Sequence, residues 1–596
     1  MPDDTMTTLS RLFLRSCRTY KKPDRMLFKA GTDWTRISTD EVEACVRRLS
    51  LGFRELGLGP GDRLAILSEN RPEWVMADLA TLSAGAVTVP IYTSLLPEQI
   101  RFLLEDSGTR IVVCSDLDLW RKVEAVRAGL PALERVIVVD GDPPAGTHAL
   151  SDVVEMGRRA EEADPGAFER AAEAVRPEDL ASIIYTSGTT GVPKGVMLSH
   201  ANFVSNVLSL AAFIDFNDTD LGLSFLPLSH VLERTATFFL FHVGASMAYA
   251  ESIEAVATNM VEVRPTIIVS VPRLFEKIYT RIMDMVMAGS RVKRAIFVWA
   301  LATGKKHAAK TIAREPVPAH LAVKHGLARR LVFGKILAKT GGRIRYAICG
   351  GAPLSRDIAE FFYAIGLRIM PGYGLTETSP VLTGSTPERV RFGSAGVPIP
   401  GVELRVAEDG EILARGANVM MGYYKNEADT REVLKDGWLA TGDIGRFDED
   451  GFLFITDRKK DIIVTSGGKN VAPQPIESLV QASPYITSAV VVGSSRKFIS
   501  ALVVPDFGKL EALAKAKGWA FADRAALCRR PEAAAFLLEE ANRMTPGLAS
   551  YERIKKVAVL DREFELDAGE VTPTLKVRRT IVEQKYADII DGLYRD

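Results

Sequence analysis

The first part of the chain alternates between two hydrophobic patterns. Residues 40–58 repeat apolar positions every three to four residues, as an amphipathic helix does, and helix-like stretches recur at 73–83 and 97–106. Short, continuous apolar runs separate these stretches and predict buried strands. The expected strands are 64–67, 86–91, 111–114 and 136–139. Strands that alternate with helices indicate an α/β fold of mostly parallel sheets covered by helices.

The middle of the chain departs from this alternation in three places. Residues 141–178 are rich in Gly, Pro, Ala and charge, which predicts a surface excursion. Residues 281–340 predict a long, mainly helical segment. Residues 393–457 are rich in Gly and in residues that favour strands, so we expect a smaller β-subdomain there.

Near residue 457 the chain becomes charged and loses its periodic pattern. Beyond it, apolar runs predict strands at 489–492 and 499–504, followed by helices. A length of 596 residues suits a large domain joined to a smaller one. We therefore expect a large N-terminal domain at 1–457 and a small α+β C-terminal domain at 458–596.

Composition excludes several classes of protein. The 75 basic and 75 acidic residues balance, so nothing global favours a nucleic-acid partner. Five scattered cysteines fit reduced thiols in a cytoplasmic protein better than a disulfide framework. Residues 1–4 are acidic and no apolar core follows, so no signal peptide is expected. The uncharged run that includes the aromatic residues, at 235–250, has 16 residues, and a membrane span needs about 20.

The segment 281–340 has an unusual charge. It carries 13 Lys and Arg residues against only Asp284 and Glu315. Such a segment attracts an anionic membrane surface, and peripheral contact with the inner face of the membrane is one interpretation. A solvated pair of helices explains the charge equally well.

The strongest chemical signal is a glycine-rich loop. An apolar run at 180–185 leads into residues 185–195, whose sequence is YTSGTTGVPKG. Glycines let successive backbone N–H groups point inward and form a nest for phosphate oxygens, while Lys194 adds a positive charge. The spacing differs from that of the common P-loop. Composition alone would favour an ordinary glycine-rich turn. The interpretation as a phosphate-binding loop therefore depends on the motifs that accompany it.

Five further motifs follow this loop along the chain. They are GGAPL at 350–354, PGYGLTET at 371–378, TGD at 441–443, DRKKD at 457–461, and Lys576 near the C-terminus. Together with the loop, this set resembles the adenylate-forming (AMP-binding) superfamily, which includes acyl-CoA synthetases, firefly-type luciferases and peptide-synthetase adenylation domains. The motifs stand in the family order and span almost the whole chain.

The resemblance implies that ATP converts a carboxylate into an acyl adenylate with release of pyrophosphate. Positioning and electrostatics would do most of this work. By resemblance, Gly350, Gly351 and Ala352 run beside the adenine, and Tyr373, next to Gly374, stacks on its face. The loop residues that would cradle the β- and γ-phosphates are Thr186, Ser187, Gly188, Thr189, Thr190, Gly191 and Lys194.

Further site residues are implied in the same way. Thr376 would contact the α-phosphate, and Glu377 would hold Mg²⁺, a cation that prefers carboxylate and phosphate oxygens. Asp443 resembles the aspartate that accepts hydrogen bonds from the ribose hydroxyls, and Arg458 resembles the arginine that faces ribose and phosphate. Lys576 resembles the lysine that bridges the carboxylate and the α-phosphate.

The second half reaction of the family transfers the acyl group to coenzyme A. The resemblance implies a mobile C-terminal domain that rotates about a hinge, and Lys460 matches the hinge position. Ser466, Gly467 and Gly468 resemble the loop that then forms the channel for the CoA thiol. Rotation between two rigid arrangements is an established device in enzymes.

The acid substrate is suggested by residues 226–241. This stretch resembles the version found in long-chain acyl-CoA synthetases, and it includes the aromatic run 238–241. His230 is a candidate for steering the carboxylate, and a purely structural histidine is the open alternative. Aromatic residues at this density usually belong to a core. We expect Gly244, Ala245 and Ser246 to line the far end of an acyl tunnel.

The sequence thus predicts a long-chain fatty acid–CoA ligase that uses ATP, Mg²⁺ and coenzyme A. The alternative is a fatty acyl-AMP ligase that passes its acyl group to a carrier protein, but residues 458–466 lack the insertion described for those enzymes. A peptide-synthetase module is disfavoured because only 20 residues follow Lys576. A lipid-binding protein without catalysis is disfavoured because the candidate site residues are all present. An oligomer is compatible with the sequence.

Overall fold

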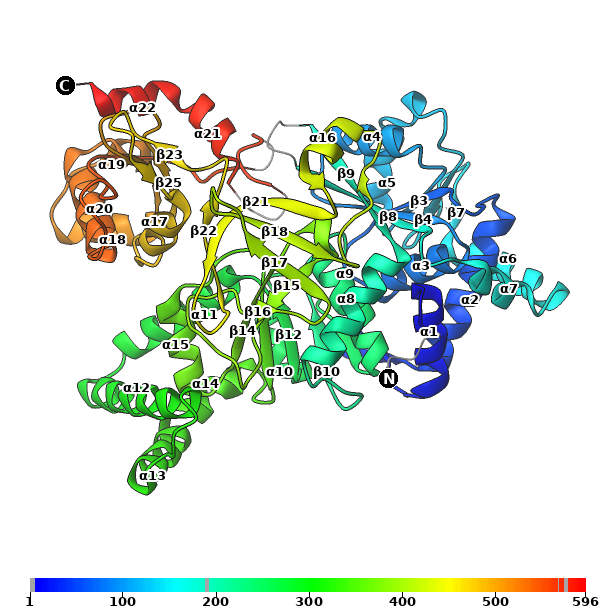
Figure 1. Ribbon diagram of the computed structural model, residues 1–596, viewed down its shortest axis with the longest axis horizontal. Coiled ribbons are helices and arrows are strands. Elements are labelled where there is room, and N and C mark those ends of the chain that lie inside the picture. Colours follow the sequence, from blue (N-terminus) through cyan, green and yellow to red (C-terminus); the bar gives the residue numbers. More distant parts are fainter. Residues whose placement is uncertain (1–5, 188–191, 566–567, 573–576, 596) are drawn as a thin grey trace.

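The computed structural model describes residues 6–187, 192–565, 568–572 and 577–595. Its body contains a nine-stranded and an eight-stranded sheet, each with hydrophobic cores on both faces (Figure 1). A five-stranded sheet and a smaller C-terminal unit follow, the latter at the upper left of Figure 1. The expected α/β architecture of mostly parallel, helix-covered sheets is confirmed.

The nine-stranded sheet supplies most of the strands that matter for function. Four of them lie side by side and run parallel to one another. They are β10 (Leu221–Ser224), β12 (Ile267–Ser270), β13 (Tyr346–Cys349) and β14 (Ile369–Gly374). Because parallel neighbours end at the same edge of a sheet, the segments that follow these strands converge there.

The eight-stranded sheet contains the strands expected near the N-terminus. They are β3 (Arg63–Leu67), β4 (Val87–Ile91), β5 (Ile111–Cys114) and β6 (Arg135–Val138). The antiparallel hairpin of β8 (Leu180–Ser187) and β9 (Pro193–Ser199) extends this sheet beyond β4. This hairpin frames the glycine-rich loop.

Alternate residues of the strands enter different cores. Leu64 and Ile66 of β3 join the core between the two sheets, whereas Ala65 and Leu67 pack on the outer face. Strands buried on both faces read as continuous apolar runs, which explains the sequence pattern. The inner layer holds α1 (Leu9–Thr19), α3 (Pro72–Ser83), α8 (His200–Phe213) and α9 (Val231–Val243).

A buried ion pair ties α9 to α3. Arg234 donates to both carboxylate oxygens of Asp78, from Nε at 2.8 Å and from Nη2 at 2.6 Å. Its Nη1 donates to Ser182 of β8 at 2.6 Å. Both charged side chains are only 1% exposed, so the pair is satisfied inside the core. This network fixes how α9 lies between the sheets.

Residues 141–178 differ from the expected surface excursion. They form α6 (Leu150–Ala163) and α7 (Ala167–Ala174), and α6 packs closely on α2 (Thr39–Glu55). A Cβ on Gly157 would lie 1.7 Å from the carbonyl oxygen of Arg48, so only glycine fits at this contact. The high Ala and charge content hid a narrow apolar stripe that includes Leu150 and Val153.

The helices α12 (Arg291–Ile312) and α13 (Ala319–Ala328) project at the lower left of Figure 1, and α11 (Pro272–Met287) leads to them from the body. We call α11, α12 and α13 together the helical arm. The helical character expected for 281–340 is therefore confirmed. In the described part of the chain, no helix is both long and apolar enough to cross a membrane.

The remaining strands lie where the sequence predicted β structure. The five-stranded sheet consists of β17 (Val402–Val406), β18 (Glu411–Gly416), β20 (Leu434–Lys435), β21 (Trp438–Phe447) and β22 (Leu453–Arg458). The C-terminal unit has cores of its own around a three-stranded sheet. That sheet contains β25 (Ile486–Val492), β26 (Ser500–Pro505) and β27 (Val557–Val559).

Candidate active site

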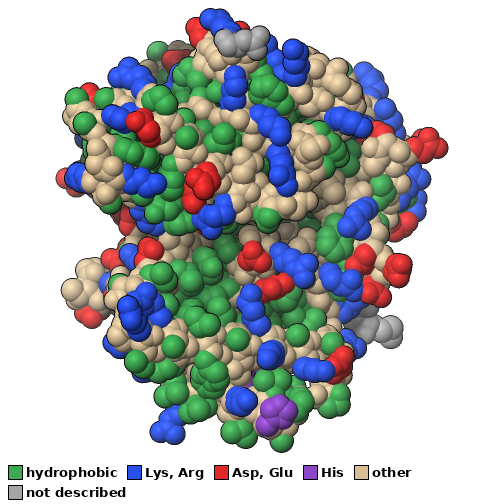
Figure 2. Space-filling model, turned by 90° about the vertical axis from the view of Figure 1, so that its left-hand side faces the viewer, with side chains coloured by type: hydrophobic (Ala, Val, Ile, Leu, Met, Phe, Trp, Pro, Cys, Tyr) green, Lys and Arg blue, Asp and Glu red, His purple; other side chains and the backbone are tan. Residues whose placement is uncertain are grey.

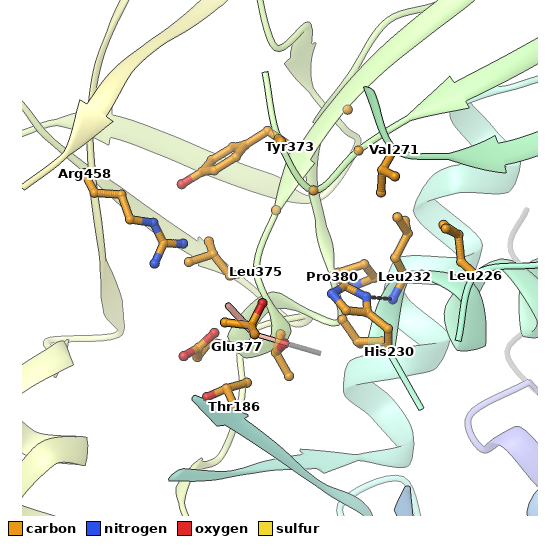
Figure 3. A pocket seen from close by; sticks show the side chains of 18 of the residues that line it. Thr186, Leu226, His230, Leu232, Val271, Tyr373, Leu375, Glu377, Pro380 and Arg458 are labelled. Atoms are coloured by element: carbon orange, nitrogen blue, oxygen red, sulfur yellow. Dashed lines mark hydrogen bonds between the residues drawn. The ribbon is translucent and has the colours of Figure 1, made fainter. Parts of the chain in front are cut away.

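A cavity of about 1950 Å³ opens where the carboxyl ends of β10, β12, β13 and β14 meet. Ligands of open α/β sheets bind at this edge. Figure 3 shows that the cavity has two different sides. Thr186, Glu377 and Arg458 lie on the polar side, and Leu226 and Val271 lie on the apolar side. One cavity therefore offers room for a charged and an apolar group together.

The residues predicted to contact the adenine lie at the ends of β13 and β14. Gly350, Gly351 and Ala352 leave the end of β13 and line the cavity, as does Tyr373 near the end of β14. The Tyr373 hydroxyl donates to Asp443 Oδ2 at 2.7 Å. Burial, followed by the Asp443 charge, raises the pKa of Tyr373, so its hydroxyl stays protonated.

Asp443 lies just behind the cavity wall. Its side chain is 6% exposed, and Arg458 Nε lies 3.3 Å from its Oδ1. These two residues face each other across paired strands β21 and β22. The carboxylate is thus held between a phenol and a guanidinium that both line the cavity.

The turn after β14 carries the predicted phosphate and metal residues. Gly374 is needed there because a Cβ would lie 1.8 Å from the carbonyl oxygen of Pro380. Thr376 and Glu377 follow in the short 3₁₀ helix η4 (Thr376–Thr378), and both line the cavity. The Tyr423 hydroxyl donates to Glu377 Oε1 at 2.9 Å and orients the carboxylate.

The oxygen atoms of this part of the site suit Mg²⁺ that is shared with substrate phosphates better than a metal ion bound by protein side chains alone. Within the described residues, no group of three His, Cys, Asp or Glu side chains could hold a metal. Mg²⁺ is commonly bound by one or two carboxylates together with substrate phosphates. A single oriented carboxylate, Glu377, beside the Thr186 and Thr376 hydroxyls fits that pattern.

The glycine-rich loop faces the cavity through its two ends. Thr186 and Lys194 both line it. Lys194 Nζ forms an ion pair with Asp429 of α16 (Glu427–Val433), and this pair holds the pKa of Asp429 below its usual value. Ser187 ends β8, and its side chain lies outside the described residues. The other predicted loop residues and the C-terminal lysine lie wholly outside the described residues: Gly188, Thr189, Thr190, Gly191 and Lys576.

His230 marks the junction between the two sides of the cavity. It is the N-cap residue of α9, and its Nδ1 accepts the Leu232 N–H at 3.1 Å (Figure 3). The neutral ring therefore carries its proton on Nε2, an atom that can donate to a carboxylate. His230 also lines the cavity, so its cap role and its candidate steering role are compatible.

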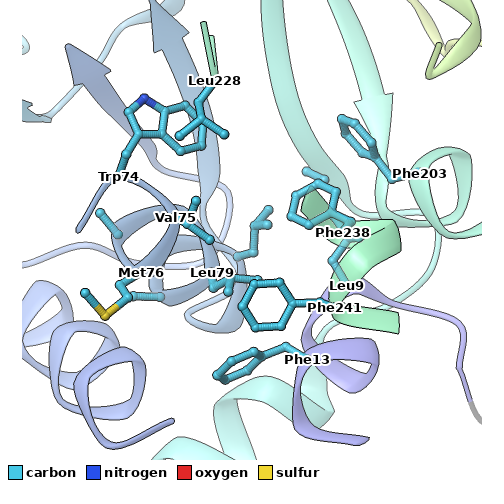
Figure 4. Packing of buried hydrophobic residues seen from close by; sticks show 14 of the residues in the cluster. Leu9, Phe13, Trp74, Val75, Met76, Leu79, Phe203, Leu228, Phe238 and Phe241 are labelled. Atoms are coloured by element: carbon cyan, nitrogen blue, oxygen red, sulfur yellow. The ribbon is translucent and has the colours of Figure 1, made fainter. Parts of the chain in front are cut away.

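The apolar side continues along α9. Leu232, Ala236 and Leu240 follow one another at four-residue spacing, and all three line the cavity. The aromatic run is divided: Phe239 lines the cavity, whereas Phe238 and Phe241 pack in the core with Phe203 and Phe13 (Figure 4). A helix has several faces, so one run of aromatic residues serves two purposes.

The prediction for the residues that line the far end of the tunnel is wrong. Gly244, Ala245 and Ser246 do not line the cavity. Gly244 instead ends α9 with a φ of +79°, and a Cβ there would lie 2.4 Å from the Tyr20 ring. The cavity is bounded by side chains from α8 and from the following segment, including Phe213 and Phe216.

The C-terminal unit closes one side of the cavity. Thr572 and Val577, which flank the segment containing Lys576, line it, and so does Lys460. Ser466, Gly467 and Gly468 do not line it. In this arrangement the two residues that flank the segment predicted for adenylation therefore line the cavity, whereas the loop predicted for thiol transfer does not.

Sequence reasoning missed Tyr423 and Asp429. Tyr423 reaches the site because β19 (Gly422–Tyr423) pairs with β9, so that Tyr423 lies opposite Val196. Asp429 reaches it because α16 follows directly. A pairing between strands more than 200 residues apart leaves no local signal, so only the fold reveals these two residues.

Two family models match this chain. The family model described as "AMP-binding enzyme" matches residues 15–424, and "AMP-binding enzyme C-terminal domain" matches residues 460–596. Long-chain-fatty-acid–CoA ligase FadD15 of Mycobacterium bovis is 38% identical over 582 residues, which cover 96% of this chain and 95% of that protein. Long-chain-fatty-acid–CoA ligase ACSBG1 of Rattus norvegicus is 30% identical, and the match covers 99% of this chain and 86% of that protein.

A solved structure shares the whole architecture. ATP-bound MatB from Rhodopseudomonas palustris superimposes with a TM-score of 0.67 at 26% identity. The match covers 98% of this chain and 99% of MatB. The similarity therefore includes both the body and the C-terminal unit.

Proposed function

The chain belongs to the AMP-binding enzyme family, and from this premise we propose that it is a long-chain fatty acid–CoA ligase. The observation that carries the proposal is the two-sided cavity, in which the polar groups near Glu377 meet the apolar side at His230. The names of the relatives at 38% and 30% identity support the same substrate class. An acid with a long apolar chain fits such a cavity.

In the first half reaction, a carboxylate oxygen attacks the α-phosphorus of ATP and the bond to pyrophosphate breaks. His230 would hold the carboxylate, and Thr376 would donate to the α-phosphate. Lys194 would leave Asp429 for the β- and γ-phosphates, while Arg458 and Asp443 hold the ribose. Mg²⁺ bound at Glu377 would neutralise the charge that develops on pyrophosphate. Lys576 would bridge the carboxylate and the α-phosphate.

In the second half reaction, the sulfur of CoA attacks the acyl carbonyl and AMP leaves. We place the domain boundary at residues 457–458 and the hinge at Lys460. Rotation of residues 458–596 would withdraw the segment 572–577 and bring Ser466, Gly467 and Gly468 to the site. Thr572 and Val577 line the cavity in the present arrangement, whereas Ser466, Gly467 and Gly468 do not, which is consistent with the arrangement that this proposal requires for adenylation.

Pyrophosphate release and thioester formation test the proposal. The enzyme is incubated with hexadecanoate, ATP and Mg²⁺, with and without CoA. A CoA ligase gives acyl-CoA, AMP and pyrophosphate when CoA is present. A fatty acyl-AMP ligase releases pyrophosphate but forms no acyl-CoA, and a protein that only binds lipid releases none.

We also propose that residues 281–340 contact the cytoplasmic face of a membrane, with the enzyme otherwise in the cytoplasm. The support is the excess of 13 Lys and Arg over two acidic residues. Each basic residue near an anionic surface contributes roughly 1 kcal/mol before salt screening. Sedimentation with liposomes at low and high salt tests this, and binding that ignores both lipid charge and salt would refute it.

A further inference from the structure

A second hollow lies on the helical arm, away from the active-site cavity. It has a volume of about 370 Å³ and runs between α11 and α12. Met283 and Val286 of α11 face Phe297 and Val298 of α12 across it. Seven of the nine side chains that line it are apolar, and none is acidic. We call this hollow the arm groove.

The two polar residues of the arm groove are both cations, Arg294 and Lys305. They are eleven residues apart on α12, which is three helical turns or roughly 16 Å along one face. Arg294 Nε is buried without a hydrogen-bond partner among the described residues. An apolar floor with a positive charge near each end matches a ligand that has an apolar chain and an anionic head.

The surface around the arm groove has the same mixed character. Of 18 large hydrophobic side chains that are exposed in the described part of the chain, eight lie within 281–340, a tenth of its length. Figure 2 shows hydrophobic side chains gathered among Lys and Arg side chains in the lower half of this face. Solvated helices explain the charge but not this gathering of exposed apolar groups.

We propose that the arm groove binds one acyl chain of an anionic phospholipid while the arm lies on a membrane. The phosphate would be held by Arg294, whose planar guanidinium suits phosphate better than a lysine does. This inference rests on the membrane contact proposed above and adds a defined lipid site to it. The first turns of α11, at Arg273 and Leu274, line the active-site cavity, so one helix connects the two sites.

Two double variants separate a lipid site from general attraction. Arg294→Gln with Val298→Gln removes one cation and one exposed valine from the arm groove. Lys293→Gln with Val292→Gln removes one positive charge and one exposed valine from α12 outside the groove. Val298 and Val292 are 64% and 67% exposed, so the two variants lose similar charge and similar apolar surface.

The measurement is affinity for vesicles of phosphatidylglycerol and phosphatidylcholine, with pure phosphatidylcholine as the neutral reference. We expect the groove variant to bind at least about fivefold more weakly than the control variant. Equal losses in both variants would refute the groove. Wild-type binding that is equally strong on neutral vesicles would also refute an anionic ligand.

A second measurement uses the unmodified protein. A phosphatidylglycerol with a photoreactive diazirine in one acyl chain is incorporated into the vesicles, and cross-linked peptides are identified by mass spectrometry. We expect labels within 283–302, and labels confined to other segments would overturn the proposal. Thioester formation from soluble octanoate without vesicles tests the ligase function independently, because it does not require the arm groove.

Discussion

At the scale of single residues, the candidate site depends on partners that are distant in the sequence. Glu377 is oriented by Tyr423, and Tyr373 is hydrogen-bonded to Asp443. The resemblance named three of these four residues, because they stand in motifs. Tyr423 lies outside these motifs, although it contacts the predicted metal ligand Glu377 directly.

The Tyr423 contact predicts a specific effect on Mg²⁺. Tyr423→Phe removes the hydrogen bond to Glu377 and leaves the ring, so the carboxylate loses its orientation. Loss of such an outer contact typically costs 10- to 100-fold in metal affinity or activity. We expect a rise of about tenfold in the Mg²⁺ concentration that gives half-maximal pyrophosphate release. Tyr424→Phe, next to it, is the control and should leave that concentration unchanged.

A buried carboxyl group predicts how stability depends on pH. Burial raises the pKa of Glu233 to about 8, and its Oε2 has no hydrogen-bond partner among the described residues. The folded protein therefore keeps a proton that the unfolded chain releases near pH 4.5. The contribution of this group to stability is complete below pH 4.5 and is lost as the pH rises through 8.

Glu233→Gln tests this sign, because the amide resembles the protonated acid at every pH. We expect the melting temperature of the variant to depend less on pH between about 5 and 8 than that of the wild type. The variant should gain relative stability toward pH 8. Glu427→Gln, at an exposed position, is the control. Parallel curves for wild type and Glu233→Gln would show that Glu233 ionises in the folded protein as it does in water.

At the scale of elements, α9 organises the apolar side of the cavity. His230 caps its start, Arg234 anchors it to Asp78, and Leu232, Ala236 and Leu240 form a stripe along it. With a rise of about 1.5 Å per residue, Ala236 lies roughly 9 Å and Leu240 roughly 15 Å beyond His230 along the axis. If the proposed acyl chain runs along α9, positions on this helix would set how long a chain the cavity accepts.

Two substitutions on this stripe should shorten the cavity at different depths. Ala236→Phe should lower kcat/KM for both octanoate and hexadecanoate, because both chains pass that position. Leu240→Phe should lower it about tenfold for hexadecanoate and leave octanoate nearly unchanged. The measurement is kcat/KM over a series of saturated acids. If both variants affect all chain lengths alike, the acyl chain does not run along α9.

Elements with a strong local pattern could be predicted from the sequence. The buried strands β3 to β6 and the helix α2 lie within a few residues of their expected positions, because continuous or periodic apolar residues define them. The helices α6 and α7 could not be predicted, because their apolar stripe is narrow and rich in alanine. The prediction that Gly244 lines the end of a tunnel failed for another reason. Small residues also end helices, and Gly244 ends α9.

At the scale of the whole molecule, the cavity belongs to both parts of the chain. Thr572 and Val577 of the C-terminal unit line it together with residues from β13 and β14. The N-terminal side could be predicted because strand ends and motifs coincide there. The position of the C-terminal unit could not be predicted, because it depends on contacts between surfaces that have no sequence pattern.

The proposed rotation predicts opposite defects in two variants. Lys576→Ala should abolish adenylate formation but largely spare thioester formation from supplied acyl-AMP. Gly467→Leu should spare adenylation, because no atom of the described residues, chain neighbours aside, lies within 4 Å of a Cβ at Gly467, and Gly467 does not line the cavity. After rotation the new side chain would fill the thiol channel, so acyl-AMP should accumulate. Both half reactions are measured separately with hexadecanoate. Equal loss of both half reactions in either variant would contradict a division of labour between two arrangements.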